Sequence, residues 1–216
     1  MYSLLKNFSK LPLRLIQVTA RSVGWLLYVS NSSARRVTEI NLRSAYPELS
    51  ESERDQLTRR SLKSQCMTYA ESVKIWGSAP EFALEQIKVV HGEDIFLDAL
   101  QNPNGTLAVV PHFGTWELMN AWVNLHTAPV IMYKPSKNPD VDRFMLEARQ
   151  RLNATLVPTD ETGVRALFKH LKQGGFAAIL PDHVPKESGG IYSPFFGQNA
   201  LSSTLLSKLA AKTQCS

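Results

Sequence analysis

The sequence is poor in the residues and motifs on which several enzyme classes depend. Only two of its 216 residues are cysteines, Cys66 and Cys215, which is too few for a disulfide framework. The five histidines form no His-Glu-x-x-His pattern and have no Cys-x-x-Cys partner. Glycine-rich phosphate loops and a Gly-x-Ser-x-Gly nucleophile turn are also missing. The sequence therefore gives no support for a metal site, nucleotide hydrolysis or serine-hydrolase chemistry.

Acidic residues are absent from the first 38 positions. This arm holds six of the 24 basic residues and none of the 19 acidic ones, so the rest of the chain is almost neutral. Leucine, isoleucine, valine and aromatic residues alternate with the positive charges. Such a mixture is typical of a helix that lies on a membrane surface and is attracted by anionic headgroups, and we expect no nucleic-acid partner.

Long hydrophobic runs are absent as well. The longest in the arm is Val23 to Val29, and Arg14, Gln17 and Arg21 interrupt any longer window, whereas a spanning helix needs about 20 mostly apolar residues. No Ala-x-Ala-like cleavage site follows the run. We therefore expect residues 1–30 to form an amphipathic, membrane-anchoring helix. A true span and an ordinary amphipathic helix packed on the domain are the alternatives.

Two segments with different hydrophobic patterns follow the arm. Ser50 and Glu53 form a capping-box pattern that opens a long helix, which Gly77 and Pro80 end. From about residue 86, short apolar runs alternate with amphipathic segments, which is typical of strands and helices in a mostly parallel sheet. The expected strands are 87–90, 106–111, 129–133, 155–157 and 176–181; the expected helices are 93–101, 115–126, 139–152 and 160–173. The sequence thus predicts one α/β domain over 31–216, a mostly parallel sheet flanked by helices, after an N-terminal helical membrane-associating region.

The segment from Val109 to Glu117 carries the best candidates for chemistry. It places His112 directly after an apolar run and Glu117 five positions later. If His112 ends a strand and Glu117 lies in the first turn of the next helix, the carboxylate can orient the imidazole as a general base. Gly114 permits the turn between them and Thr115 is a candidate N-cap. Active sites of α/β proteins gather at this end of their strands.

Five segments resemble, in order and spacing, those of the bacterial lipid A biosynthesis acyltransferases. The His-x4-Asp/Glu signature corresponds to His112 to Glu117. The others are Asn41-Leu-Arg-Ser-Ala-Tyr-Pro-Glu-Leu49, Met132-Tyr-Lys-Pro-Ser-Lys-Asn-Pro139, Leu180-Pro-Asp-His183 and Tyr192-Ser-Pro-Phe-Phe-Gly197. The resemblance implies a fold like that of the glycerolipid acyltransferases.

The resemblance also implies a reaction. The enzyme would move a fatty acyl chain from acyl carrier protein, or from acyl-CoA, to a hydroxyl of a lipid A precursor. His112 would be the base and Glu117 its orienting partner. The thioester donor is a co-substrate, so no cofactor is expected. The resemblance places such an enzyme at the cytoplasmic face of the bacterial inner membrane.

Other residues are candidates for substrate binding. Backbone amides near Gly114 and Thr115 can stabilise an oxyanion. Lys134, Lys137 and Asn138 lie in a loop suited to phosphate, and Arg165 can face an anion, although solvated surface positions explain these residues as well. Asp182 closes a strand, where a structural hydrogen bond is as good an explanation as catalysis. Phe195 and Phe196 can wall an acyl channel or belong to a core and turn.

Two departures from the family pattern bear on activity. Lysine stands at position 134, where the family usually has arginine. Lysine keeps the charge but lacks the bidentate fork of arginine that suits phosphate. The chain also stops at Ser216, where family members continue, so we expect an incomplete domain in which a helix over 201–213 should lead to a further strand. The alternatives are therefore an acyltransferase for another glycolipid or phospholipid, and an inactive, truncated membrane-binding fragment.

Overall fold

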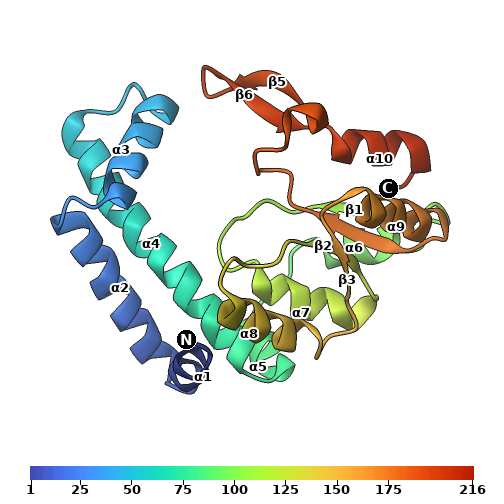
Figure 1. The fold of residues 1–216 in the computed structure, drawn as a ribbon, viewed down its shortest axis with the longest axis horizontal. Coiled ribbons are helices and arrows are strands. Elements are labelled where there is room, and N and C mark those ends of the chain that lie inside the picture. The colour runs from blue at the N-terminus through green and yellow to red at the C-terminus, as the bar shows by residue number, and fades with distance from the viewer.

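The computed structural model describes residues 1–216, and the first half of the chain is helical (Figure 1). The helices are α1 (Tyr2–Ser9), α2 (Leu13–Val29), α3 (Ser33–Ala45), α4 (Glu51–Gly77), α5 (Pro80–Gln86) and α6 (Glu93–Ala99). The single helix expected over 1–30 is instead divided into α1 and α2. Pro12 stands directly before α2, where its fixed φ and missing N–H suit a helix start and not a helix interior.

The long helix α4 begins and ends where the sequence predicts. The Ser50 hydroxyl accepts a hydrogen bond from the Glu53 N–H, and the Glu53 carboxylate accepts one from the Ser50 N–H, which confirms the capping box. Gly77 is the last residue of α4, and Pro80 occupies the first turn of α5. This helix runs diagonally between the N-terminal helices and the remainder of the molecule (Figure 1).

Helix α2 packs along α4 through small and branched residues spaced by four. Ile16, Ala20 and Gly24 are buried. A Cβ at Gly24 would lie 2.7 Å from the Cα of Lys63, so only glycine allows this approach of the two helices. The rest of α2 exposes apolar side chains: Leu15, Val18, Val23, Trp25, Leu26 and Val29. None of the helices combines the length and the apolar character that crossing a bilayer requires.

Four short parallel strands form the central sheet and confirm the predicted α/β fold. In space their order is β1 (Thr106–Val109), β4 (Phe176–Ile179), β2 (Val130–Tyr133) and β3 (Thr155–Pro158). A fifth strand, expected over 87–90, is not formed. The outer edge of β1 is bonded instead to Ser216, whose carbonyl accepts the Leu107 N–H.

Alternating side chains of the sheet supply two layers of core. On one face Leu107, Ala177 and Ile179 pack with Leu167 and Leu171 of α9 (Glu161–Lys172). On the other face Phe176 and Ala178 pack with Val123 of α7 (Glu117–His126). Helix α8 (Pro139–Arg149) links this part to the N-terminal helices, because Phe144 packs edge-to-face on Tyr2.

An antiparallel hairpin follows the sheet and is separate from it (Figure 1). After a short 3-10 helix (Glu187–Gly189), strand β5 (Gly190–Phe195) pairs with β6 (Gln198–Ser203), and α10 (Leu205–Thr213) returns to the sheet. The helix expected over 201–213 therefore begins four residues late. Residues 201–203 are extended because they pair with β5, which the apolar spacing of this segment does not reveal.

Candidate functional site

A histidine and an aspartate meet at the carboxyl edge of the sheet. His112 follows β1 and Asp182 follows β4, and these two strands are neighbours. The His112 backbone N–H donates to Asp182 Oδ2 at 2.7 Å, and His112 Nδ1 lies 2.7 Å from Asp182 Oδ1. Both the main chain and the ring of His112 are therefore held by one carboxylate.

This arrangement fixes the tautomer of the imidazole. An ionised carboxylate can only accept hydrogen bonds, so Nδ1 carries a proton, and the neutral form of the ring is the tautomer whose Nε2 has the free lone pair. Burial tends to raise the pKa of Asp182, but the hydrogen bonds from His112 outweigh it and leave this pKa below its ordinary value. Asp182 is thus ionised at neutral pH, as the pairing requires.

The pair is open to solvent on one side. The side chains of His112 and Asp182 are 44% and 38% exposed. Trp116 packs edge-on against the imidazole, with ring centroids 4.9 Å apart, and Nε2 has no hydrogen-bond partner within the chain. A substrate hydroxyl can therefore reach Nε2 without displacing a protein group.

The turn after His112 leaves backbone donors free. Gly114 has a φ of +58°, in the left-handed region that glycine favours, as the sequence predicts. The backbone N–H groups of Gly114 and Thr115 have no acceptor within the chain. Unpaired backbone amides of this kind can stabilise a developing oxyanion.

Glu117 does not lie against His112, contrary to the sequence-based expectation. It begins α7, as predicted, but its carboxylate is buried and accepts a hydrogen bond from Arg149 Nη2 at 2.8 Å. The side chains are only 4% and 17% exposed. Because α7 turns away from the strand end, the Glu117 side chain points at the end of α8, and Asp182 occupies the place beside the imidazole.

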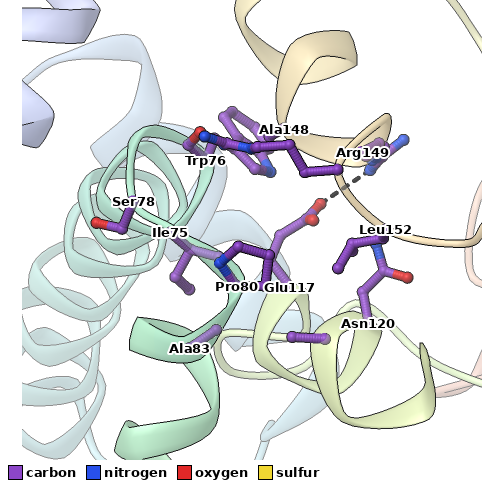
Figure 2. A pocket seen from close by; sticks show the side chains of 12 residues that line it. Ile75, Trp76, Ser78, Pro80, Ala83, Glu117, Asn120, Ala148, Arg149 and Leu152 are labelled. Atoms are coloured by element: carbon purple, nitrogen blue, oxygen red, sulfur yellow. Dashed lines mark hydrogen bonds and ion pairs between the residues drawn. The ribbon is translucent and has the colours of Figure 1, made fainter. Parts of the chain in front are cut away.

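Figure 2 shows the Glu117 carboxylate and the Arg149 guanidinium joined by their hydrogen bond in the lining of a small cavity between α4, α5, α7 and α8. The cavity measures about 30 Å³, enough for a water-sized group and far too small for an acyl chain. Arg149 Nε and Trp76 Nε1 are buried without a partner. The guanidinium also lies 5.7 Å from the centre of the Tyr133 ring.

Thr115 is not the N-cap of α7. That position belongs to Trp116, whose side chain makes no capping bond. The Thr115 hydroxyl instead donates to Glu71 Oε2 on α4 at 2.6 Å. The loop between β1 and α7 is thus fastened to three elements through Asp182, Glu71 and Arg149.

The remaining predicted residues lie in exposed loops or helix ends. Lys134 and Lys137 are exposed in the loop after β2 and form no ion pair. Asn138 caps α8 by accepting from the N–H groups of Asp140 and Val141, so its side-chain oxygen has a structural role. Arg165 is 80% exposed and lies 3.7 Å from Glu161.

Phe195 and Phe196 lie at the turn of the hairpin, in edge-to-face contact and both exposed. Phe196 has a φ of +48°, an unusual conformation for an aromatic residue. Of the expectations stated above, the one that places them in a turn is met, whereas neither residue belongs to the core.

Two residues of the site escape sequence reasoning. Arg149 is in the last turn of α8, where a basic residue is explained by the helix dipole, and Glu71 is one of many polar residues on α4. Their partners lie 32 and 44 positions away. No local pattern reveals such contacts. The chain also brings together no group of three histidine, cysteine or carboxylate side chains that could hold a metal ion.

Comparison with known proteins agrees with the motif pattern. The model of a family described as bacterial lipid A biosynthesis acyltransferase matches residues 2–216. Among curated relatives, a lipid A biosynthesis acyltransferase of Haemophilus influenzae is 26% identical over 86% of this chain and 59% of its own length. The lipid A biosynthesis lauroyltransferase of Escherichia coli is 25% identical over 90% of this chain and 63% of its own. The chain therefore spans about three fifths of the length of these relatives.

Proposed function

The chain belongs to the bacterial lipid A biosynthesis acyltransferase family, and from this we propose that it transfers a fatty acyl chain from an activated thioester to a hydroxyl of a lipid A precursor. The observation that carries the proposal is the His112–Asp182 pair at the carboxyl edge of the sheet. It supplies a general base of fixed tautomer, open to solvent, beside unpaired backbone amides.

In the proposed reaction, Nε2 of His112 takes the proton of the acceptor hydroxyl. At the same time the oxygen of that hydroxyl attacks the thioester carbonyl carbon. The C–O bond forms, and the carbonyl electrons move onto the oxygen. When the tetrahedral intermediate collapses, the C–S bond breaks, and the leaving thiolate takes the proton back from His112. Asp182 stabilises the imidazolium in between, and such a base is typically worth about 10²–10⁴ in rate.

The oxyanion is assigned to the amides of Gly114 and Thr115, which have no other acceptor. One such donor is typically worth about 10²–10³ in turnover. We assign Glu117 a different role from that of orienting the imidazole. Its buried pairing with Arg149 anchors the start of α7, and hence the end of the loop that carries these donors.

The donor in this proposal is acyl carrier protein or acyl-CoA, and the acceptor is the hydroxyl of a 3-hydroxyacyl chain on a phosphorylated glucosamine disaccharide. Both partners are acidic. The exposed Lys134 and Lys137 suit their phosphates, and Arg165 is a further candidate despite its contact with Glu161. The exposed Phe195 and Phe196 are candidates for contact with an acyl chain.

We also propose that the N-terminal helices hold the enzyme at the cytoplasmic face of the inner membrane. The face of α2 that does not pack on α4 exposes the apolar residues named above, and the first 38 residues carry only basic charges. Such a surface suits an anionic bilayer.

The test is acyl transfer by the 216-residue chain, in membranes, from lauroyl acyl carrier protein to a tetra-acyl lipid A precursor, read by mass spectrometry. We expect a mass gain of one acyl chain that His112→Ala abolishes and His91→Ala, at an exposed histidine between α5 and α6, does not. Full activity of His112→Ala would contradict the mechanism. If the parent transfers nothing to this acceptor but acylates another lipid, the acceptor is wrong; if only a version extended like its relatives is active, the 216-residue chain is an inactive fragment.

A further inference from the structure

The loop between β1 and α7 is bonded through its main chain near both ends, but its middle, around Gly114, has few such bonds. Residues 110–116 contain no helix or strand, and Phe113 N–H bonds only to the nearby Pro111 carbonyl. Gly114, with its positive φ and open surroundings, adds flexibility in the middle of the loop. The Thr115 carbonyl accepts from the Leu118 N–H and the Thr115 hydroxyl bonds to α4, so the position of the free amides at Gly114 and Thr115 depends in part on the Thr115 side chain.

Glu71 is the anchor of Thr115. It lies in the sixth turn of α4 and is partly buried. Its Oε2 accepts the hydrogen bond of the Thr115 hydroxyl at 2.6 Å, and its Oε1 accepts one from Gln17 Nε2 of α2 at 2.8 Å. One carboxylate thus joins three segments that are far apart in the sequence.

A carboxylate suits this position better than any other side chain. It offers two acceptor oxygens and no donor, so it can bind a hydroxyl and an amide N–H at the same time. Lys74, one turn further along α4, forms no ion pair with it, and its ammonium group donates to the Ser9 carbonyl. Glu71, Lys74, Gln17 and Thr115 all border one cavity of about 220 Å³.

We propose that Glu71 is a positioning residue for acyl transfer. By holding Thr115, it keeps the amides of Gly114 and Thr115 directed at the reacting carbonyl, and it ties this loop to α2. The inference rests on the proposed function, in which these amides bind the oxyanion. Displacement of such donors by about 1 Å is enough to cost on the order of 10²-fold in rate.

The test uses isosteric pairs. Thr115→Val removes the hydroxyl and keeps the shape, whereas Thr115→Ser keeps the hydroxyl; Glu71→Leu removes both acceptors. We expect Thr115→Val and Glu71→Leu to lower kcat by about 10- to 100-fold. Because Thr115 and Glu71 do not contact the acceptor in this proposal, its KM should change less than about twofold. Thr115→Ser should retain most of kcat, and the double variant should lose no more than the worse single variant, because both break the same contact.

Backbone hydrogen exchange makes the inference independent of turnover. Within residues 112–118, the N–H groups of His112 and Leu118 are protected by hydrogen bonds to Asp182 and to the Thr115 carbonyl. Exchange at these protected amides should become about 10-fold faster in Thr115→Val and in Glu71→Leu, because the loop opens more often when the anchor is lost. Peptides covering β4 serve as the control for folding and should not change. Thr127→Val, at a threonine whose side chain makes no hydrogen bond, is the matched control variant.

The outcomes separate the two proposals. A parent chain without turnover refutes the proposed function of this chain, while faster exchange at residues 112–118 still supports the anchoring role of Glu71. Unchanged exchange in both variants overturns the inference whatever the activity. In an active parent, normal kcat in Thr115→Val, or an equal loss in Thr115→Ser, also overturns it.

Discussion

The Asp182 carboxylate accepts two hydrogen bonds from His112, one from its main chain and one from its ring, both at 2.7 Å. Neither bond alone would fix the residue. The main-chain bond sets the position of the strand end, and the ring bond sets the rotation and tautomer of the imidazole. The imidazole is therefore oriented by a residue that follows the neighbouring strand, 70 positions away in sequence.

Replacing Asp182 should damage catalysis far more than folding. Asp182→Asn puts an amide in place of one acceptor oxygen, so Nδ1–H loses its fixed partner and the wrong tautomer becomes populated. We expect kcat to fall by about 10²–10⁴. The measurement is the transfer assay, with Asp94→Asn, at an exposed position of α6, as the control. A loss of less than threefold would mean that Asp182 does not orient the base.

The buried Glu117–Arg149 pair should behave as a unit in stability. Arg149→Met leaves a carboxylate that is 4% exposed without its partner, and removing one member of such a pair typically costs about 3–5 kcal/mol. Urea denaturation would measure this loss of unfolding free energy. Arg149→Met combined with Glu117→Gln should be more stable than Arg149→Met alone, because the second change removes the uncompensated charge. Equal stability of the two would show that Glu117 is not confined against Arg149.

Stability at alkaline pH should depend on Tyr133. Burial, together with the hydrogen bond to Asp142, raises the pKa of Tyr133 from 10.0 to about 12. A group whose pKa is raised by folding stabilises the fold below its unfolded pKa and loses that contribution as the pH rises through the folded value. The free energy of unfolding should therefore fall between pH 10 and 12.

The comparison that isolates this effect is Tyr133→Phe. The variant should be less stable than the parent at neutral pH, and the difference should shrink as the pH rises through this window. Tyr69→Phe, at a tyrosine that is 63% exposed, should show no such convergence. If the difference in unfolding free energy between the parent and Tyr133→Phe stays constant with pH, folding does not raise the pKa of Tyr133.

Membrane binding should depend on the outer face of α2. Deleting residues 1–30 would also uncover the buried side of α4, so point substitutions are the cleaner test. Leu15→Ser, Val18→Ser and Leu26→Ser together should weaken binding to vesicles of anionic phospholipid by at least about 10-fold, since each exposed apolar side chain gains from burial in lipid. High salt should weaken parent binding in part.

The control is Ile95→Ser on α6, which removes an even more exposed apolar residue from another part of the surface. It should leave vesicle binding unchanged. If the triple variant binds as tightly as the parent, the contact with the membrane is made elsewhere.

Local patterns predict most of the fold. The capping box at Ser50, the end of α4 at Gly77 and four of the five expected strands depend on residues close in sequence, and the structure has them. The exceptions are long-range. Residues 87–90 are apolar enough for a strand but find no neighbour, and residues 201–203 become a strand because a partner forms nearby.

The candidate site is predicted less completely for the same reason. His112, Gly114 and Asp182 are marked by their positions at strand ends and turns, which local signals can locate. Which carboxylate reaches the imidazole depends on the order of strands in the sheet and on the direction in which α7 leaves the loop. Neither the strand order nor the direction of α7 can be inferred from the spacing of His112 and Glu117. The carboxylate that is nearer in sequence is therefore not the one that contacts the imidazole.

The order of the strands has a consequence for refolding. Between His112 and Asp182 the chain forms α7, β2, α8, β3, α9 and β4, and β4 must insert between β1 and β2 before the two residues can meet. Closing so long a loop is entropically expensive and slow compared with helix formation. Catalytic competence should thus be among the last properties to return after dilution from denaturant, well after the far-ultraviolet signal of the helices.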